Sequence, residues 1–140
     1  MSDANRILTG NSGNVWINGK LLTTIKSIEL KVTGNFEDVN ICGDNATYNR
    51  FLGWSGEGTC TWGKVDSTVL KLLADSYKTG DMPEIKIISK LTDKTTKKSE
   101  RAAVSEVVFT EFFLTKFEAK TMVDEEIPLK FSDYEVLETI

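Results

Sequence analysis

Residues 58–64 have the spacing of a phosphate-binding loop. They read Gly-Thr-Cys-Thr-Trp-Gly-Lys, which fits the pattern G-x-x-x-x-G-K, and a helical pattern follows them. Such a loop binds phosphates through backbone N–H groups and a lysine, and it binds magnesium through a serine or threonine hydroxyl. Val65 occupies the position of that hydroxyl, and Trp62 would keep phosphates away from the backbone. The spacing therefore predicts only a loop that leads into a helix.

Residues 38–49 partly match a calcium-binding loop of the EF-hand type. Asp38 and Asn40 stand at the first and third positions, but Cys42 and Asn49 stand at the fifth and twelfth. Calcium needs oxygen ligands at those two positions, the last of them a bidentate glutamate. We therefore expect a turn-rich segment without a metal ion.

Three consecutive carboxylates, Asp124, Glu125 and Glu126, have the residue type needed for acid–base chemistry. Paired carboxylates perform it when their surroundings drive their pKa values apart. Adjacent side chains on an exposed turn point in opposite directions and remain hydrated, so no pKa would move toward neutrality. We expect solvated charges on a hairpin turn over residues 123–126.

Histidine is absent from the 140 residues, which include 17 basic and 21 acidic side chains. Its absence removes nucleophile–histidine pairs, histidine-containing zinc sites and the commonest general base. The formal charge of −4 provides no basic surface for duplex DNA. It also argues against a stacking platform for single strands built from Trp16, Trp54 and Trp62, which we expect in the core or in an interface. We predict a protein that is not an enzyme, with no catalytic residue, cofactor or metal.

The length of 140 residues predicts one domain, residues 1–140. The polar residues 1–6 do not lead into the apolar segment of a signal peptide. No apolar run approaches the roughly 20 residues that span a bilayer. We therefore expect synthesis in the cytoplasm, no membrane partner, and two free reduced thiols, Cys42 and Cys60.

The first third of the chain has the pattern of β-structure. Apolar residues on both sides of Asn18-Gly19 predict a tight hairpin over 15–22, because a type I′ turn needs positive φ at both central positions. Residues 25–32 alternate between apolar and polar and predict a half-buried strand. Residues 34–60 mix glycines with aromatic residues, so we expect a long arm that packs against another surface.

The remainder predicts one helix followed by strands. The helix over 66–79 has an apolar stripe, with Asp66 or Ser67 at its N-cap and Gly80 just past its end. Alternating or valine-rich stretches predict strands at 84–91, 101–109, 112–119, 127–131 and 134–137. The expected fold is mainly β (α+β): an antiparallel β-sandwich or half-barrel with one central helix.

Taken together, these features resemble the tail tube proteins of contractile-tailed phages. The resemblance is strongest to the tube proteins of defective prophages and R-type bacteriocins (tailocins) of Gram-positive bacteria. It covers essentially the whole chain, because the single helix and four segments occur in the right order and spacing. These segments are Val-Trp-Ile-Asn-Gly-Lys at 15–20, Ile-Glu-Leu-Lys-Val at 28–32, the run at 50–58 and Glu-Glu-Ile-Pro-Leu-Lys-Phe at 125–131.

The resemblance implies a structural protomer whose hexameric rings stack into a hollow tube inside a sheath. The implied partners are other copies of the chain, the tail sheath protein, baseplate or initiator proteins and the tape-measure protein. In a phage, genome DNA would pass through the lumen without specific binding, helped by negative charge on the wall. The protein would be made in the host bacterial cytoplasm and found in a virion tail or a released bacteriocin particle.

The resemblance also implies that the arm is an interface between subunits or rings. The residues expected there are Phe36, Tyr48, Arg50, Phe51 and Trp54. The alternative function is a secreted ring-forming tube protein of the haemolysin-coregulated type, or a ligand-binding β-barrel module. That alternative predicts a stable free ring or a ligand pocket, and no polymeric tubes.

Overall fold

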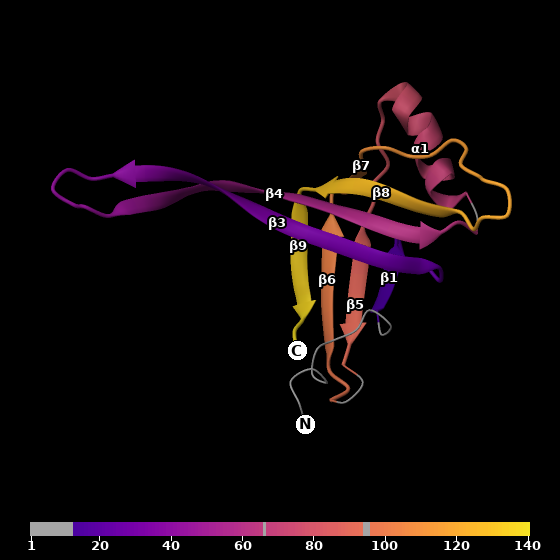
Figure 1. Ribbon diagram of the computed structural model, residues 1–140, viewed down its shortest axis with the longest axis horizontal. Helices are drawn as coiled ribbons and strands as arrows, with labels where there is room; N and C mark the ends of the chain where they lie inside the picture. The colour runs from indigo at the N-terminus through magenta and orange to yellow at the C-terminus, as the bar shows by residue number, and fades with distance from the viewer. Residues whose placement is uncertain (1–12, 66, 94–95) are drawn as a thin grey trace.

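The computed structural model describes residues 13–65, 67–93 and 96–140. Within these ranges the chain forms two antiparallel sheets and one helix, and the strands of one sheet run across those of the other (Figure 1). The predicted fold class, mainly β with an antiparallel sandwich and one helix, is confirmed. No helix among these residues has the length and apolar character needed to cross a membrane.

The five-stranded sheet starts from the predicted hairpin. Asn18 and Gly19 have φ of 50° and 84°, so both adopt the left-handed conformation that a type I′ turn requires. In spatial order the sheet contains β2 (Lys20–Leu21), β1 (Gly13–Ile17), β5 (Ile87–Thr92), β6 (Ser99–Ser105) and β9 (Asp133–Glu138).

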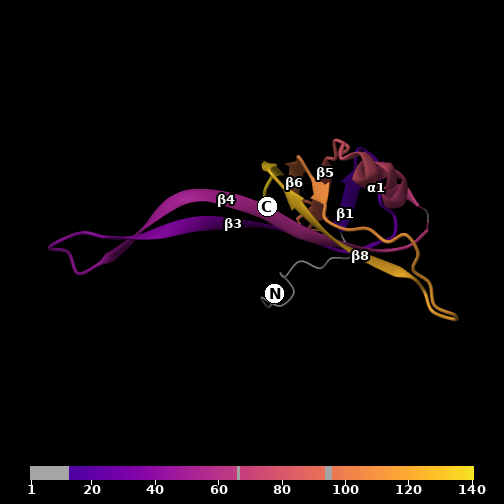
Figure 2. The same ribbon diagram turned by 90° about the horizontal axis from the view of Figure 1, so that it is seen from above.

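The four-stranded sheet is built on a hairpin that extends well beyond the rest of the molecule (Figure 2). In spatial order it contains β3 (Ile25–Asn40), β4 (Thr47–Gly63), β8 (Asp124–Phe131) and β7 (Val108–Phe109). We call the projecting part, residues 34–54, the arm. Residues 55–60, which we expected in the arm, pack on the body instead, since Gly56 and Cys60 are buried.

The helix, α1 (Thr68–Thr79), closes one end of the sandwich. Val69 and Leu73 are buried in the common core, and the stripe predicted from the sequence is confirmed for these two residues. Ser67 is the N-cap and Gly80 ends the helix with φ of 83°, while the alternative N-cap Asp66 lies outside the described residues. The other buried residues of the core are Val15, Ile17, Cys60, Trp62, Ile85, Ile87, Val104, Val107, Phe109, Ile127, Leu129 and Phe131.

Several predicted strand boundaries are wrong. The strand expected at 101–109 is interrupted at Glu106, whose φ is 54°, and its two parts, β6 and β7, belong to different sheets. The strand expected at 112–119 is absent, because this segment belongs to a loop over residues 110–123 that passes along the helix. There the ring of Phe112 packs against Tyr77 with centroids 5.0 Å apart. The strand expected at 84–91 begins at Ile87.

The arm joins the body where an aromatic cluster covers a glycine. Trp54 contacts the rings of Phe131 and Tyr134, with centroid distances of 6.3 and 5.0 Å. The Phe131 ring lies directly on Gly56, where any Cβ atom would overlap it. This close approach brings β8 against β4 at the point where the hairpin leaves the body, so it fixes the direction of the arm.

We predict that Gly56→Val destabilises the protein by about 1–3 kcal/mol, because the new side chain displaces the Phe131 ring from a packed position. Ser55→Val is the matched control: its side chain is exposed on the opposite face, and its effect should stay within about 0.5 kcal/mol. Urea unfolding of the two variants measures the difference. Equal losses of stability would contradict the role assigned to Gly56.

Candidate assembly interface

All five predicted interface residues lie on the arm, and four of them are exposed. These are Phe36, Tyr48, Arg50 and Phe51. The rings of Phe36 and Phe51 face each other across β3 and β4 in an edge-to-face contact, with centroids 5.4 Å apart. They are nevertheless 60% and 55% exposed. The fifth residue, Trp54, is half-buried where the arm meets the body, so its structural environment differs from that of the others.

The tip of the arm is ordered by a short polar network. Asp44 accepts hydrogen bonds from the Ala46 backbone N–H and from the Tyr48 hydroxyl. The Tyr48 hydroxyl and the backbone donor together hold the pKa of the Asp44 carboxyl below its usual value. Both hydrogen bonds lie within the tip, so they stabilise the turn that joins β3 to β4.

The two sheets leave long edges open. Strand β3 spans 16 residues and pairs only with β4 among the described residues. Strand β9 is the corresponding outer strand of the five-stranded sheet, and its side chains are exposed. Unpaired backbone N–H and C=O groups on such edges are ready to pair with another chain. The molecule therefore presents two potential pairing surfaces besides the arm.

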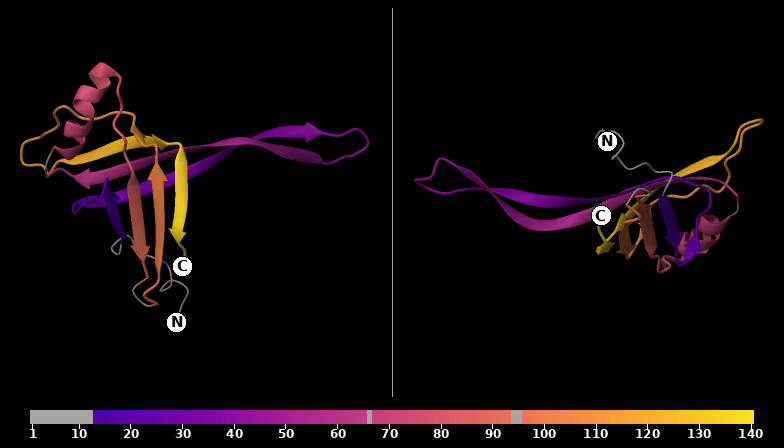
Figure 3. Two further views of the ribbon diagram at one scale, coloured as in Figure 1. Left: turned by 180° about the vertical axis from the view of Figure 1, so that it is seen from behind. Right: turned by 90° about the horizontal axis from the view of Figure 1, so that it is seen from below.

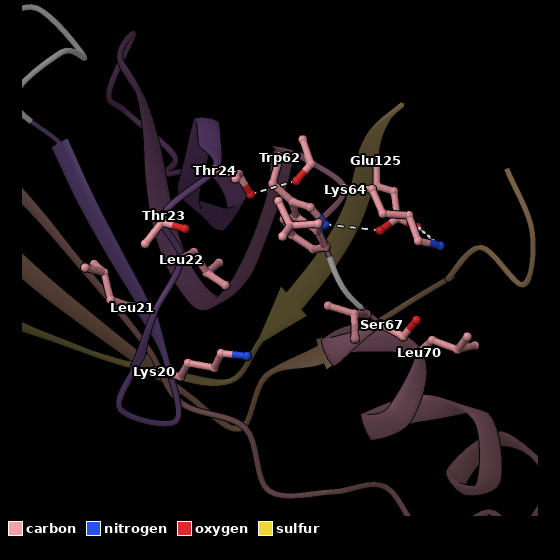
Figure 4. Close-up of a pocket in the computed structure, with 13 residues that line it drawn as sticks. Lys20, Leu21, Leu22, Thr23, Thr24, Trp62, Lys64, Ser67, Leu70 and Glu125 are labelled. Carbon is pink, nitrogen blue, oxygen red and sulfur yellow. Dashed lines mark hydrogen bonds and ion pairs between the residues drawn. The ribbon is translucent and has the colours of Figure 1, made fainter. Parts of the chain in front are cut away.

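A buried polar cluster lies at the end of the four-stranded sheet opposite the arm. Glu125 is 6% exposed, and the Trp62 indole N–H donates a hydrogen bond of 3.2 Å to its carboxylate. Lys64 Nζ lies 3.8 Å from the other carboxylate oxygen (Figure 4). The predicted solvated turn over 123–126 is thus wrong, because β8 already begins at Asp124 and strand alternation turns Glu125 inward.

This cluster forms part of the wall of a cavity of about 80 Å³. Ligand pockets for small molecules are usually several times larger, about 300–1,000 Å³. The contacts of Glu125 instead hold strands together: Trp62 and Glu125 are register partners, and the Lys64 N–H donates to the Val123 carbonyl at 2.9 Å. The arrangement is suited to fixing the register between β4 and β8. Sequence reasoning missed the burial of Glu125, although the apolar–polar alternation of 127–131 extends back to this residue.

A second, larger groove of about 850 Å³ lies next to the loop over residues 110–123. We call it the loop groove. Its apolar lining residues are Ile25, Val65, Leu114, Phe117, Met122 and Val123, and four of them, Val65, Leu114, Phe117 and Met122, are more than 70% exposed. Sequence reasoning missed this surface because the segment was expected to be a strand with one buried face.

The two segments that partly match a phosphate-binding loop and a calcium-binding loop both lie in the β3–β4 hairpin. Residues 58–63 form the end of β4 rather than the predicted loop, and residues 38–49 form the distal end of the arm. No group of three metal-binding side chains occurs in the described part of the chain. Cys42 is free and exposed at the arm tip, whereas Cys60 is free and buried in the core.

A family model described as phage tail tube protein matches residues 1–138. The chain belongs to the phage tail tube protein family. The phage-like element PBSX protein XkdM of Bacillus subtilis is 29% identical over 139 residues, which cover 98% of this chain and 95% of that protein. The protein YqbM of the same strain is 28% identical, with the same coverage. The predicted function of a tail tube protein is confirmed.

Solved structures agree with this tail tube fold. The anti-feeding prophage cap, known from cryo-EM, is similar with a TM-score of 0.77 and 11% identity, covering 95% of this chain and 92% of that chain. The sheath–tube complex of an extracellular contractile injection system, in its extended state, is similar with a TM-score of 0.76 and 13% identity. That match covers 95% of this chain and 93% of the other.

We predict that Glu125→Ala destabilises the tail tube protomer by about 1–3 kcal/mol, because it leaves the buried Trp62 N–H without an acceptor. Glu125→Gln keeps an acceptor oxygen for the Trp62 N–H and should therefore lower the stability less than Glu125→Ala does. Glu126→Ala is the control, since Glu126 is an exposed neighbour on the same strand. Denaturant unfolding at a concentration where the protein is monomeric gives the comparison, and similar losses for Glu125→Ala and Glu126→Ala would refute the assigned role.

We also predict different reactivities for the two thiols. Burial raises the pKa of the Cys60 thiol to about 12, and the thiolate is the reactive form, so this residue should be inert near pH 8. Iodoacetamide should add one label, at Cys42, to the folded protomer and a second label only in denaturant. Intact-mass and peptide mass spectrometry count and locate the labels. Modification of Cys60 in the folded protein at pH 8 would contradict the prediction.

Proposed function

We propose that this chain is the protomer of the inner tail tube of a contractile injection machine. Six copies form a ring, and rings stack into a hollow tube inside a sheath. The observation that carries the proposal is the arm: a member of the tail tube family projects Phe36 and Phe51 into solvent on a ribbon that the body of the protomer does not cover. Exposed aromatic side chains of this kind mark surfaces that become buried on association.

The open sheet edges support ring formation. A protein that stays monomeric usually blunts its sheet edges with charges, prolines or covering loops. Here β3 leaves a long edge open, and pairing of this edge with the sheet of a neighbouring copy would extend the sheet around a ring. Closure of the ring would leave no edge of the four-stranded sheet unpaired, which stops growth in that direction.

The face of the four-stranded sheet that points away from the core has the character of a lumen wall. It is lined by serine, threonine and charged side chains and by Pro128, without aromatic residues, along the paired central parts of β3, β4 and β8. Lys31 and Glu57 form an ion pair of 3.5 Å on it. Its charged residues are Glu29, Lys31, Glu57, Glu126 and Lys130, a formal charge of −1 per protomer. A weakly negative wall of this kind would let DNA pass without binding it.

The arm is the contact between neighbouring copies or rings in this proposal. Phe36, Tyr48, Arg50 and Phe51 supply the contact surface, and Trp54 holds the arm at its angle to the body. The remaining partners are the tail sheath protein, the baseplate or initiator proteins and the tape-measure protein. The protein is made in the host bacterial cytoplasm and functions in a virion tail or a released bacteriocin particle.

Negative-stain microscopy of the purified protein, alone and with sheath and initiator partners, tests the proposal. Tubes with a hollow lumen that grow from the initiator are the expected result. Persistent monomers in every condition would overturn it. Stable free rings that never stack would instead favour a secreted ring-forming protein of the haemolysin-coregulated type.

We predict that Phe51→Ala hinders tube growth while leaving protomer stability within about 0.5 kcal/mol, because its ring is exposed in the protomer. Truncation of a buried interface aromatic often costs association about 2 kcal/mol or more. Trp54→Ala should reduce both tube growth and protomer stability, since Trp54 packs on Phe131 and Tyr134. Light scattering follows elongation, and thermal unfolding follows the protomer. Unchanged growth of Phe51→Ala would remove this residue from the interface.

A further inference from the structure

The arm and the loop groove lie at opposite ends of the four-stranded sheet. Figures 1 and 3 show the arm leaving the body on one side and the loop over 110–123 leaving it on the other. A single protomer therefore cannot bring its own arm tip to its own groove. If the two surfaces fit each other, the contact must join different copies, head to tail.

The groove has the apolar surface that such a contact needs. Leu114, Phe117 and Met122 are 72%, 81% and 88% exposed, and apolar side chains exposed together in this way mark a surface that binds a partner. Methionine and leucine side chains adapt to irregular partners, and an aromatic ring provides an anchor. The arm offers the complementary elements, which are the two rings of Phe36 and Phe51 on a narrow ribbon.

The charges of the two surfaces are also complementary. The arm has three acidic side chains, Glu37, Asp38 and Asp44, and one basic side chain, Arg50, so its formal charge is −2. The charged residues lining the groove are Lys26, Lys64, Lys116 and Asp124, a formal charge of +2.

Two of the three lysines of the groove form ion pairs within the protomer, and the third can interact with a partner's carboxylates. Lys26 Nζ lies 2.8 Å from Asp124, and Lys64 pairs with the buried Glu125. Lys116 instead lies over the Phe113 ring at 4.7 Å, with no carboxylate partner among the described residues. An acidic arm entering the groove would place its carboxylates near this lysine.

We propose that the loop groove is the receptor for the arm of a second copy of this chain. This inference rests on the proposed function and specifies which surface the arm contacts. The contact is heterologous, since the arm of one copy uses the groove of the next and leaves a free arm and a free groove at the two ends. Such a contact propagates until a ring closes or a filament terminates.

Cross-linking through the native Cys42 tests the proposal directly. Cys42 is exposed at the arm tip and Cys60 is buried, so a new cysteine in the groove has one accessible partner. Met122→Cys and Thr115→Cys place a thiol at two different positions that line the groove. Tubes of each variant are treated with a mild oxidant and separated by non-reducing electrophoresis. We expect a ladder of dimers, trimers and longer species, because every chain carries both halves of the contact.

The controls separate this inference from the proposed function. Adding Cys42→Ser to Met122→Cys should abolish the ladder, and Val136→Cys, which is 59% exposed but on β9, should not produce one. Peptide mass spectrometry should identify the bond between positions 42 and 122 or 115. Tubes that form normally without a ladder from either variant would overturn the groove proposal while the tube function stands. If the wild-type protein with initiator forms no tubes, the proposed function itself fails.

A charge-reversal pair provides a second readout that needs no new cysteine. Lys116→Glu and Asp38→Lys should each slow elongation, and the double variant should recover a substantial part of the wild-type rate. Additive losses in the double variant would contradict a contact between arm and groove. Protection of a label at position 122 by sheath protein, but not by tube formation, would assign the groove to the sheath and also overturn the proposal.

Discussion

The backbone ladder between β3 and β4 is the interaction on which the rest of the structure depends. Its proximal part carries Cys60 and Trp62 into the core and provides the strand to which β8 pairs. Its distal part continues beyond the body, where no core remains to bury its side chains. One continuous hairpin therefore links the packing of the protomer to the shape and direction of its exposed arm. A two-stranded ribbon is marginally stable by itself in water, so the arm gains most from being covered by a partner.

Two devices at the ends of the body keep this hairpin in place. At the end nearer the arm, the Phe131 ring packs directly on Gly56, and Trp54 packs against the Phe131 ring. These contacts anchor the arm to the body. Toward the other end, buried Glu125 joins Trp62 and Lys64 where β4 and β8 meet. A buried carboxylate costs free energy unless it is paired and hydrogen-bonded, and Glu125 has both an ion pair with Lys64 and a hydrogen bond from Trp62. The fixed register in turn sets where the loop over 110–123 emerges.

Local patterns in the sequence predict those elements whose determinants lie close together. The hairpin at Asn18-Gly19 and the alternation of 127–131 were predicted because turn chemistry and side-chain period act over a few residues. The contact of Gly56 with Phe131 could not be predicted in this way, because the two residues are distant in the sequence. The segment 112–119 has the pattern of a strand, but Phe112 packs against the helix. The aromatic residues of the arm can be recognised in the sequence, because they stand in a glycine-rich stretch. The loop groove has no sequence pattern of its own, because it forms only when the loop over 110–123 has folded.

The central claim is that the arm is the surface through which copies of this tail tube protein associate. Hydrogen–deuterium exchange, measured by mass spectrometry on the protomer and on assembled tubes, tests it most directly. Arm amides in residues 34–54 should exchange rapidly in the protomer, because the ribbon opens locally without unfolding the body. In tubes these amides should become strongly protected, while the core strands β5 and β6 change little. Equal exchange of the arm in protomer and tube would contradict the account.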